Sequence, residues 1–125
     1  MEVFGIGIDV AKVNNVNEIF FEDSSLKEVL SDKEYKLFFR LKSYKYTYVC
    51  IIWTVKEALL KALKIGLSSV VALRDISVLR KSGQYCIHVE NSAKEYFAIN
   101  NICQAEIEVQ DLNKLIVSTV TLYNK

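Results

Sequence analysis

The sequence contains no proline, only four glycines and a single histidine among its 125 residues. No proline-rich linker, repeat or low-complexity segment divides the chain, so we expect one domain spanning residues 1–125. The formal net charge is only +1. So balanced a charge excludes any argument from bulk electrostatics that the protein binds nucleic acid or a membrane surface.

Disulfides, zinc and membrane spans are also disfavoured. Cys50, Cys86 and Cys103 are odd in number, and none belongs to a C-x-x-C pair, so reduced thiols are expected. Glu2 lies where a signal peptide would carry positive charge, and Asp9 interrupts the first apolar run. The longest apolar run, residues 48–55, is far shorter than the ~20 residues that span a bilayer. We therefore expect a soluble, cytoplasmic protein.

Helical spacing of apolar residues dominates the first half of the chain, and strand-like alternation dominates the second. This order predicts the α+β class, with helices packed on a small, mainly antiparallel sheet. The expected elements are a short buried strand at 3–10, helices at 11–21, 31–41 and 49–65, a turn or short helix at 24–30, a hairpin of 75–80 and 85–89 turning at Gly83, a helix at 92–99 capped by Asn91 or Ser92, and strands at 106–109 and 115–122.

Several single residues sharpen these expectations. Gly5 and Gly7 inside the first strand predict a bulge or a close approach by backbone or ligand. Ser31, followed three residues later by Glu34, forms the signature of a helix capping box. Gly66 suits the left-handed residue that follows the end of a helix.

The predicted helix at 49–65 is apolar around almost its whole circumference, which is typical of an interior helix. Glu57, Lys61 and Lys64 share one narrow stripe, whereas Lys56 falls in the middle of the most apolar face. Because a buried charge is costly unless it is paired or coordinated, these charges require partners. For Glu57 and Lys61, four residues apart, a surface ion pair worth ~0.2–0.5 kcal/mol is the structural alternative.

The residues that could carry chemistry are mainly carboxylates and lysines. His88, in the second hairpin strand, favours a structural or surface role, and no nucleophile elbow, Walker loop or zinc motif is present. Asp9 near the end of the first strand is either a helix N-cap or a ligand. Asp9 and Glu57 together suit magnesium, which takes carboxylate oxygens, waters and substrate phosphates. The helix lysines then suit phosphate oxygens.

At the level of motifs, GIGIDV at 5–10 and WTVKEALLKALKIGL at 53–67 resemble the two signatures of the 4′-phosphopantetheinyl transferases. LSDKEY at 30–35, DISV at 75–78 and the hairpin Gly83 match further segments of that family in order and spacing. A single repeat of this length is similar to the holo-acyl carrier protein synthase type. The resemblance implies the fold of that family.

The resemblance also implies a reaction. Phosphopantetheine would move from coenzyme A to a serine of an apo acyl, peptidyl or polyketide carrier protein, and adenosine 3′,5′-bisphosphate would leave. Asp9 and Glu57 would hold Mg²⁺, and Glu57, directly or through a water molecule on the metal, would help to remove the serine proton. Lys61 would contact a phosphate oxygen. The residues implied at coenzyme A are Lys56, Lys61, Lys64 and Gly66.

The same resemblance implies a homotrimer with its sites at subunit interfaces. The sequence also departs from the family pattern at four places. Lys12 replaces an acidic residue, Lys64 replaces a glycine, no proline follows Gly83, and an S-x-S-H-like segment before the last strand is missing. Asparagines at 14, 15 and 17 also replace basic residues expected to meet the carrier. A catalytically impaired descendant, acting as a coenzyme A-binding or structural assembly module, is the alternative; a carboxylate-metal phosphohydrolase is a third reading.

Overall fold

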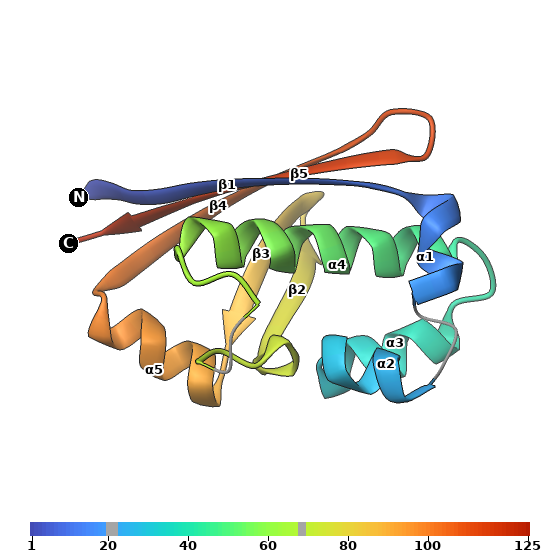
Figure 1. Cartoon of the computed structure of the whole chain (residues 1–125), viewed down its shortest axis with the longest axis horizontal. Helices are drawn as coiled ribbons and strands as arrows, with labels where there is room; N and C mark the ends of the chain where they lie inside the picture. Colours follow the sequence, from blue (N-terminus) through green and yellow to red (C-terminus); the bar gives the residue numbers. More distant parts are fainter. Residues whose placement is uncertain (20–22, 68–69) are drawn as a thin grey trace.

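The computed structural model of the chain describes residues 1–19, 23–67 and 70–125. It contains helices and antiparallel strands, with four consecutive helices after the first strand and most strands in the second half, which confirms the predicted α+β class (Figure 1). In chain order the elements are β1 (Glu2–Lys12), α1 (Val13–Ile19), α2 (Asp23–Val29), α3 (Asp32–Arg40), α4 (Lys45–Ala62), the 3₁₀ turn η1 (Leu73–Asp75), β2 (Ile76–Lys81), β3 (Gln84–Val89), α5 (Asn91–Ile99), β4 (Ile102–Asp111) and β5 (Leu115–Asn124). Within the described ranges no helix is both long enough and apolar enough to cross a membrane.

The strands form a three-stranded sheet in the order β1-β5-β4 and a separate hairpin of β2 and β3, with every pairing antiparallel. The β-branched strand β5 occupies the centre of the sheet, as its composition predicts. Helix α4 lies along one face of this sheet, and α2, α3 and α5 lie on the other side of α4 (Figure 1). The core therefore surrounds α4, whose apolar residues are buried on nearly every side.

The glycines of β1 allow its backbone to touch the backbone of α4. A Cβ atom on Gly7 would lie 1.8 Å from the carbonyl oxygen of Ala58, and one on Gly5 would lie 2.0 Å from that of Ala62. No side chain fits at such distances. The close backbone approach predicted from the two glycines is confirmed, and it brings the first half of β1 against the second half of α4.

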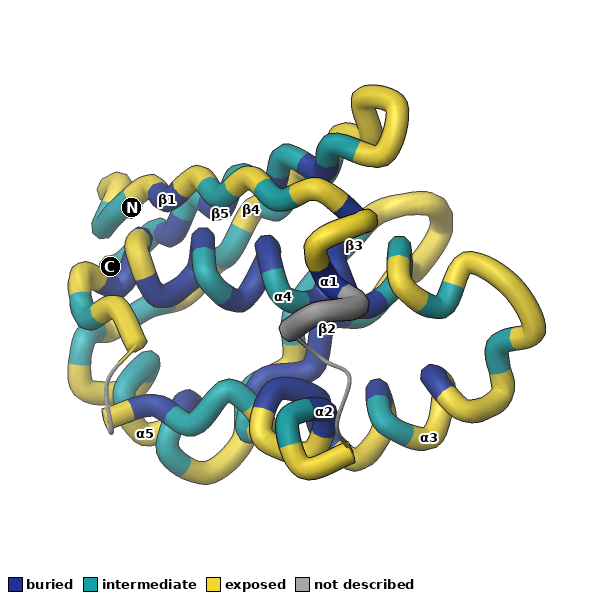
Figure 2. The backbone as a smooth tube through the Cα atoms, turned by 45° about the vertical axis from the view of Figure 1, so that its right-hand side comes forward, coloured by how far each residue is buried: buried dark blue, intermediate teal, exposed yellow. Residues whose placement is uncertain are grey.

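The expectation that the first strand is buried is wrong for one of its faces. Val3, Ile6, Ile8 and Val10 are exposed, and Ile6 keeps 59% of its accessible surface. Successive strand residues point to opposite faces, so the glycine face of β1 packs on α4 while these side chains point away from it. Figure 2 shows the resulting alternation of exposed and buried residues along β1. None of the described elements covers that outer face.

The N-terminal helices differ from the predicted ones chiefly at their ends. Strand β1 continues through Lys12, so α1 starts two residues later than expected, and the predicted end of that helix at residue 21 lies outside the described residues. The capping box of α3 is confirmed: the Ser31 amide donates to Glu34 Oε1 at 2.8 Å, and the Glu34 amide donates to Ser31 Oγ at 3.3 Å. Helix α4 starts and ends earlier than predicted, at Lys45 and Ala62.

Lys64, and not Gly66, is the left-handed residue that directly follows α4. The Ile65 amide donates to the Leu60 carbonyl at 3.2 Å and the Lys64 amide donates to the Lys61 carbonyl at 3.0 Å. These are the two bonds of a Schellman motif. Lys64 has φ of 66°, and Gly66 is also left-handed with φ of 59°.

The second half of the chain follows the prediction more closely. Ser82 and Gly83, both with positive φ, close the predicted hairpin in two residues, as the favoured hairpin turns do. The predicted caps of α5 are wrong, because Glu90 occupies the N-cap position and makes no side-chain cap bond. Instead, the Asp75 carboxylate accepts hydrogen bonds from the amide and the hydroxyl of Ser92.

Candidate active site

Asp9, Glu57 and Lys61 come together where β1 meets α4. Lys61 Nζ lies 3.0 Å from Asp9 Oδ1 and donates at 3.0 Å to the carbonyl oxygen of Ile8. The Asp9 side chain is only 17% exposed, whereas that of Lys61 is 51% exposed. Asp9 pairs with Ser118 inside the sheet, so it is not a helix N-cap. The Glu57–Lys61 surface pair considered as the alternative is also wrong, because Lys61 pairs with Asp9.

Glu57 is left with an unsatisfied oxygen. Its Oε1 is the one buried side-chain oxygen or nitrogen without a hydrogen-bond partner in the part of the chain that the structure describes. Burial and the neighbouring Asp9 charge raise the pKa of Glu57, and Lys61 opposes this effect. A buried, unpaired carboxylate oxygen is costly. A cation bound beside it would remove that cost.

A pocket of about 360 Å³ opens beside the two carboxylates. It is lined by Asp9, Val10, Ala11, Lys12, Asn15, Val16, Trp53 and Glu57. The described residues contain no cluster of three metal-ligating His, Cys, Asp or Glu side chains. Two carboxylates nevertheless fit Mg²⁺, which usually takes one or two protein carboxylates and fills its other positions with waters and substrate phosphates.

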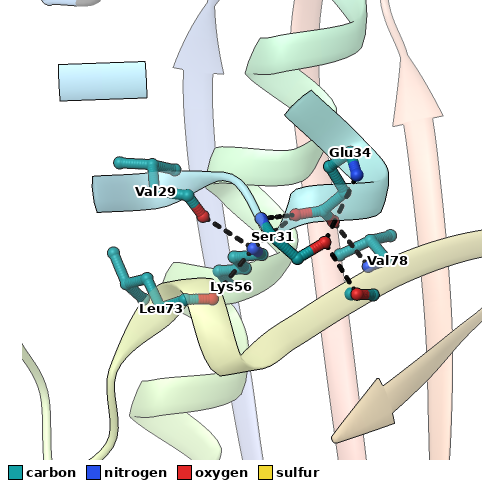
Figure 3. A network of polar contacts seen from close by, with 7 residues as sticks. Val29, Ser31, Glu34, Lys56, Leu73 and Val78 are labelled. Carbon is teal, nitrogen blue, oxygen red and sulfur yellow. Dashed lines mark hydrogen bonds and ion pairs between the residues drawn. The ribbon is translucent and has the colours of Figure 1, made fainter. Parts of the chain in front are cut away.

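Lys56 lies outside this pocket, in a buried polar network (Figure 3). Its side chain is fully buried, and Nζ donates to Glu34 Oε1 at 2.6 Å and to the carbonyl oxygens of Val29 at 2.6 Å and Leu73 at 2.9 Å. Glu34 Oε2 in turn accepts from the Val78 amide at 2.6 Å. All three ammonium protons are engaged. A contact between Lys56 and a cofactor would require one of these bonds to break.

Sequence reasoning identified the need of Lys56 for a partner but not the partner itself. The sequence pattern assigns Glu34 only to the capping box. In the structure, its Oε1 atom accepts hydrogen bonds from both the Ser31 amide and the Lys56 ammonium group. Burial lowers the pKa of Lys56, and the Glu34 charge opposes this shift. The sequence signal that could indicate this ion pair is that α3 carries an acid and α4 carries a lysine on its most apolar face.

Lys64 and Gly66 lie in the exposed segment that follows α4 and do not line the carboxylate pocket. Lys64 Nζ lies 4.8 Å from the ring centroid of Phe4, a cation–π distance. A Cβ atom on Gly66 would meet no atom within 4 Å. Contacts of either residue with a cofactor remain predictions.

Comparison with known proteins decides the family. Residues 5–119 match the family model described as the 4′-phosphopantetheinyl transferase superfamily. The chain belongs to this superfamily. The matched region contains Asp9, Glu57 and Lys61, so the resemblance inferred from the motifs is confirmed.

Named relatives and solved structures of the superfamily agree. The chain is 36% identical over 99 residues to a holo-[acyl-carrier-protein] synthase of Roseobacter denitrificans, covering 77% of this chain and 73% of the relative. It has a TM-score of 0.88 to the corresponding synthase of Neisseria meningitidis, at 18% identity and covering 98% and 99% of the two chains. The synthase of Helicobacter pylori, solved in complex with coenzyme A, gives a TM-score of 0.77 at 22% identity, covering 94% and 99% of the chains. The two structural matches establish the fold.

Proposed function

We propose that this chain is a holo-[acyl-carrier-protein] synthase, an enzyme that transfers 4′-phosphopantetheine from coenzyme A to a serine of an apo carrier protein. The observation that carries the proposal is one pocket lined by Asp9 and Glu57, in which Asp9 is paired with Lys61 and a buried Glu57 oxygen has no partner. The name of the Roseobacter relative and the coenzyme A bound to the Helicobacter protein support the same substrates.

The reaction breaks the phosphoanhydride bond of coenzyme A and forms a phosphoester bond to the serine. The serine oxygen attacks the β-phosphorus of coenzyme A, the bond to the bridging oxygen breaks, and adenosine 3′,5′-bisphosphate leaves. The serine proton goes to the Glu57 carboxylate, whose raised pKa suits a general base. Lys61 uses two of its protons on Asp9 and the Ile8 carbonyl. Its third proton can bind a phosphate oxygen on which negative charge develops.

Asp9 and Glu57 are the residues that would hold Mg²⁺ in this pocket. A bound magnesium ion neutralises charge on the pyrophosphate during transfer. Lys12 lines the same pocket, in the position where the family pattern has an acid. Its ammonium group adds a positive charge to the site, so we expect Asp9 and Glu57 to be the only carboxylates that hold the metal.

We also propose that the protein is a cytoplasmic homotrimer. The exposed side chains of β1 continue on β5, where Val117, Thr119, Thr121 and Tyr123 lie opposite Val10, Ile8, Ile6 and Val3. This forms a partly apolar face that other copies of the chain would cover. An Ile8→Glu substitution should therefore lower the mass measured by light scattering to that of a monomer. A wild-type protein that is monomeric at all concentrations would refute the trimer. The three free cysteines support a reducing compartment.

The direct test combines purified protein, coenzyme A, Mg²⁺ and apo acyl carrier protein, with the carrier analysed by mass spectrometry. The carrier should gain one phosphopantetheine group, and Glu57→Gln and Asp9→Asn should abolish the gain. Lys94→Gln, at an exposed position on α5, is the matched control and should keep full activity. Full activity in both carboxylate variants would exclude this site.

The same assay separates the alternatives. Metal-dependent coenzyme A binding without any modification of the carrier would favour a binding or assembly module. Release of free phosphopantetheine without a carrier would favour a phosphohydrolase.

A further inference from the structure

Lysines and tyrosines from two distant segments gather beside the carboxylate pocket. Tyr44, Lys45 and Tyr46 from the start of α4 line a second pocket together with Lys114 from the turn between β4 and β5. That pocket also contains Val13 at the start of α1. In Figure 1 the start of α4, α1 and the β4–β5 turn lie at the same end of the molecule. We call Tyr44, Lys45, Tyr46 and Lys114 the lysine–tyrosine patch.

The patch is continuous with the active site. The Val13 amide donates to the Lys114 carbonyl at 2.9 Å, and the preceding residue, Lys12, lines the carboxylate pocket. Since a strand rises ~3.3 Å per residue, Lys12 lies about 10 Å along β1 from Asp9. A protein whose serine enters the carboxylate pocket would extend over the patch, because even a domain of ~100 residues has a radius of gyration of ~13 Å.

Neither Lys45 nor Lys114 forms an ion pair in the described part of the chain. The neighbouring acid, Asp111, accepts from the Lys114 backbone amide at 2.8 Å. Lys45 Nζ lies 4.9 Å from the Phe38 ring centroid, a cation–π distance. Tyr44 is 81% exposed and Tyr46 is 49% exposed. Tyrosine is among the residues enriched at protein interfaces.

Helix α1 offers no competing positive surface. Its sequence, VNNVNEI, contains no lysine or arginine, although it also borders the carboxylate pocket through Asn15 and Val16. The positive side chains that line the two pockets are therefore Lys12, Lys45 and Lys114, in addition to Lys61 beside Asp9.

We infer that the lysine–tyrosine patch is the docking surface for the carrier protein, and that it selects a partner with acidic side chains around its acceptor serine. This inference rests on the proposed function. Complementary charges at the edge of an interface act mainly on encounter and orientation. The patch should therefore change the apparent affinity for the carrier and leave the chemistry at Asp9 and Glu57 intact.

The test measures steady-state kinetics with apo acyl carrier protein for Lys45→Gln/Lys114→Gln, and for Lys36→Gln/Lys94→Gln as a control that removes two exposed lysines elsewhere. The patch variant should raise KM for the carrier by about tenfold and keep kcat and KM for coenzyme A. The control should match wild type. A Lys114→Glu variant should recover with a carrier in which an acid near the serine is changed to lysine.

Each other outcome is decisive. An unchanged KM for the carrier, or the same rise in the control, would overturn the docking surface. A rise in KM for coenzyme A instead would show that these lysines bind its phosphates. Direct binding of apo carrier to each variant is measured in parallel by calorimetry. If the wild type binds the carrier through the patch but transfers nothing, the proposed function fails while the docking surface stands.

Discussion

Substitution of Lys56 by methionine should destabilise the protein severely. Both members of the Glu34–Lys56 pair are essentially inaccessible to solvent, at 1% and 0% exposure of their side chains. The variant leaves the Glu34 carboxylate buried, with the Ser31 and Val78 amides as partners but no counter-charge. Breaking one partner of a buried pair typically costs 3–5 kcal/mol. Since the total stability of a domain is ~5–15 kcal/mol, this loss is a large part of it.

A double-mutant cycle distinguishes the ion pair from general packing. Lys56→Met and Glu34→Gln singly each leave an uncompensated group, whereas the double variant leaves no buried charge. The double variant should therefore be more stable than Lys56→Met alone, with a coupling energy of about 1–3 kcal/mol. Additive losses would mean that the two groups do not stabilise each other.

The assay is guanidinium unfolding followed by circular dichroism at one fixed protein concentration, because self-association would make apparent stability depend on concentration. The matched control is Lys61→Met, on the same helix, whose side chain is half exposed. Because Lys61 is half exposed and its partner Asp9 is 17% exposed, Lys61→Met should unfold at a midpoint between those of wild type and Lys56→Met. A loss below ~1 kcal/mol for Lys56→Met would refute the reasoning.

Three further predictions concern single positions. Because the pKa of Glu57 is raised, its ionisation destabilises the folded state as pH rises above the ordinary pKa of ~4.3. In metal-free buffer, Glu57→Gln should therefore raise Tm at neutral pH. A gain in Tm that persists unchanged at pH ~3.5 would contradict this reasoning. Lys64→Gly should stabilise the protein by roughly 1 kcal/mol in denaturant unfolding because it relieves a left-handed non-glycine residue, whereas Lys64→Ala should not. Gly7→Ala, 1.8 Å from the Ala58 carbonyl, should lower Tm far more than Gly83→Ala, which meets open space; equal losses would exclude the backbone contact.

Local sequence signals predicted the parts of the structure that depend on neighbouring residues. The capping box of α3 and the hairpin turn at Gly83 lie within a few residues of their partners, and both are confirmed. Gly5 and Gly7 predicted a close approach because only glycine tolerates one. The end of α4 was missed because a lysine, not a glycine, adopts the left-handed conformation there.

Features that depend on distant packing could not be predicted in the same way. The outward face of β1 is apolar, and apolar alternation alone does not reveal whether another element covers it. The assembly of Asp9, Glu57 and Lys61 was inferred from a family resemblance, because residues about fifty positions apart give no local signal of contact. The structure supplies the physical reason in the glycine contacts between β1 and α4.

Lys56 and Glu57 are consecutive residues of α4, and they connect the buried polar network with the carboxylate pocket. Successive helical residues point ~100° apart, so the lysine reaches α3 while the glutamate reaches the pocket beside β1. The Lys56 network fixes one side of α4 against Glu34, Val29 and Leu73. The glycine contacts fix the opposite side against β1. With its rotation restrained from both sides, α4 can keep the Glu57 Oε1 atom buried without a partner, and thus available to a bound cation.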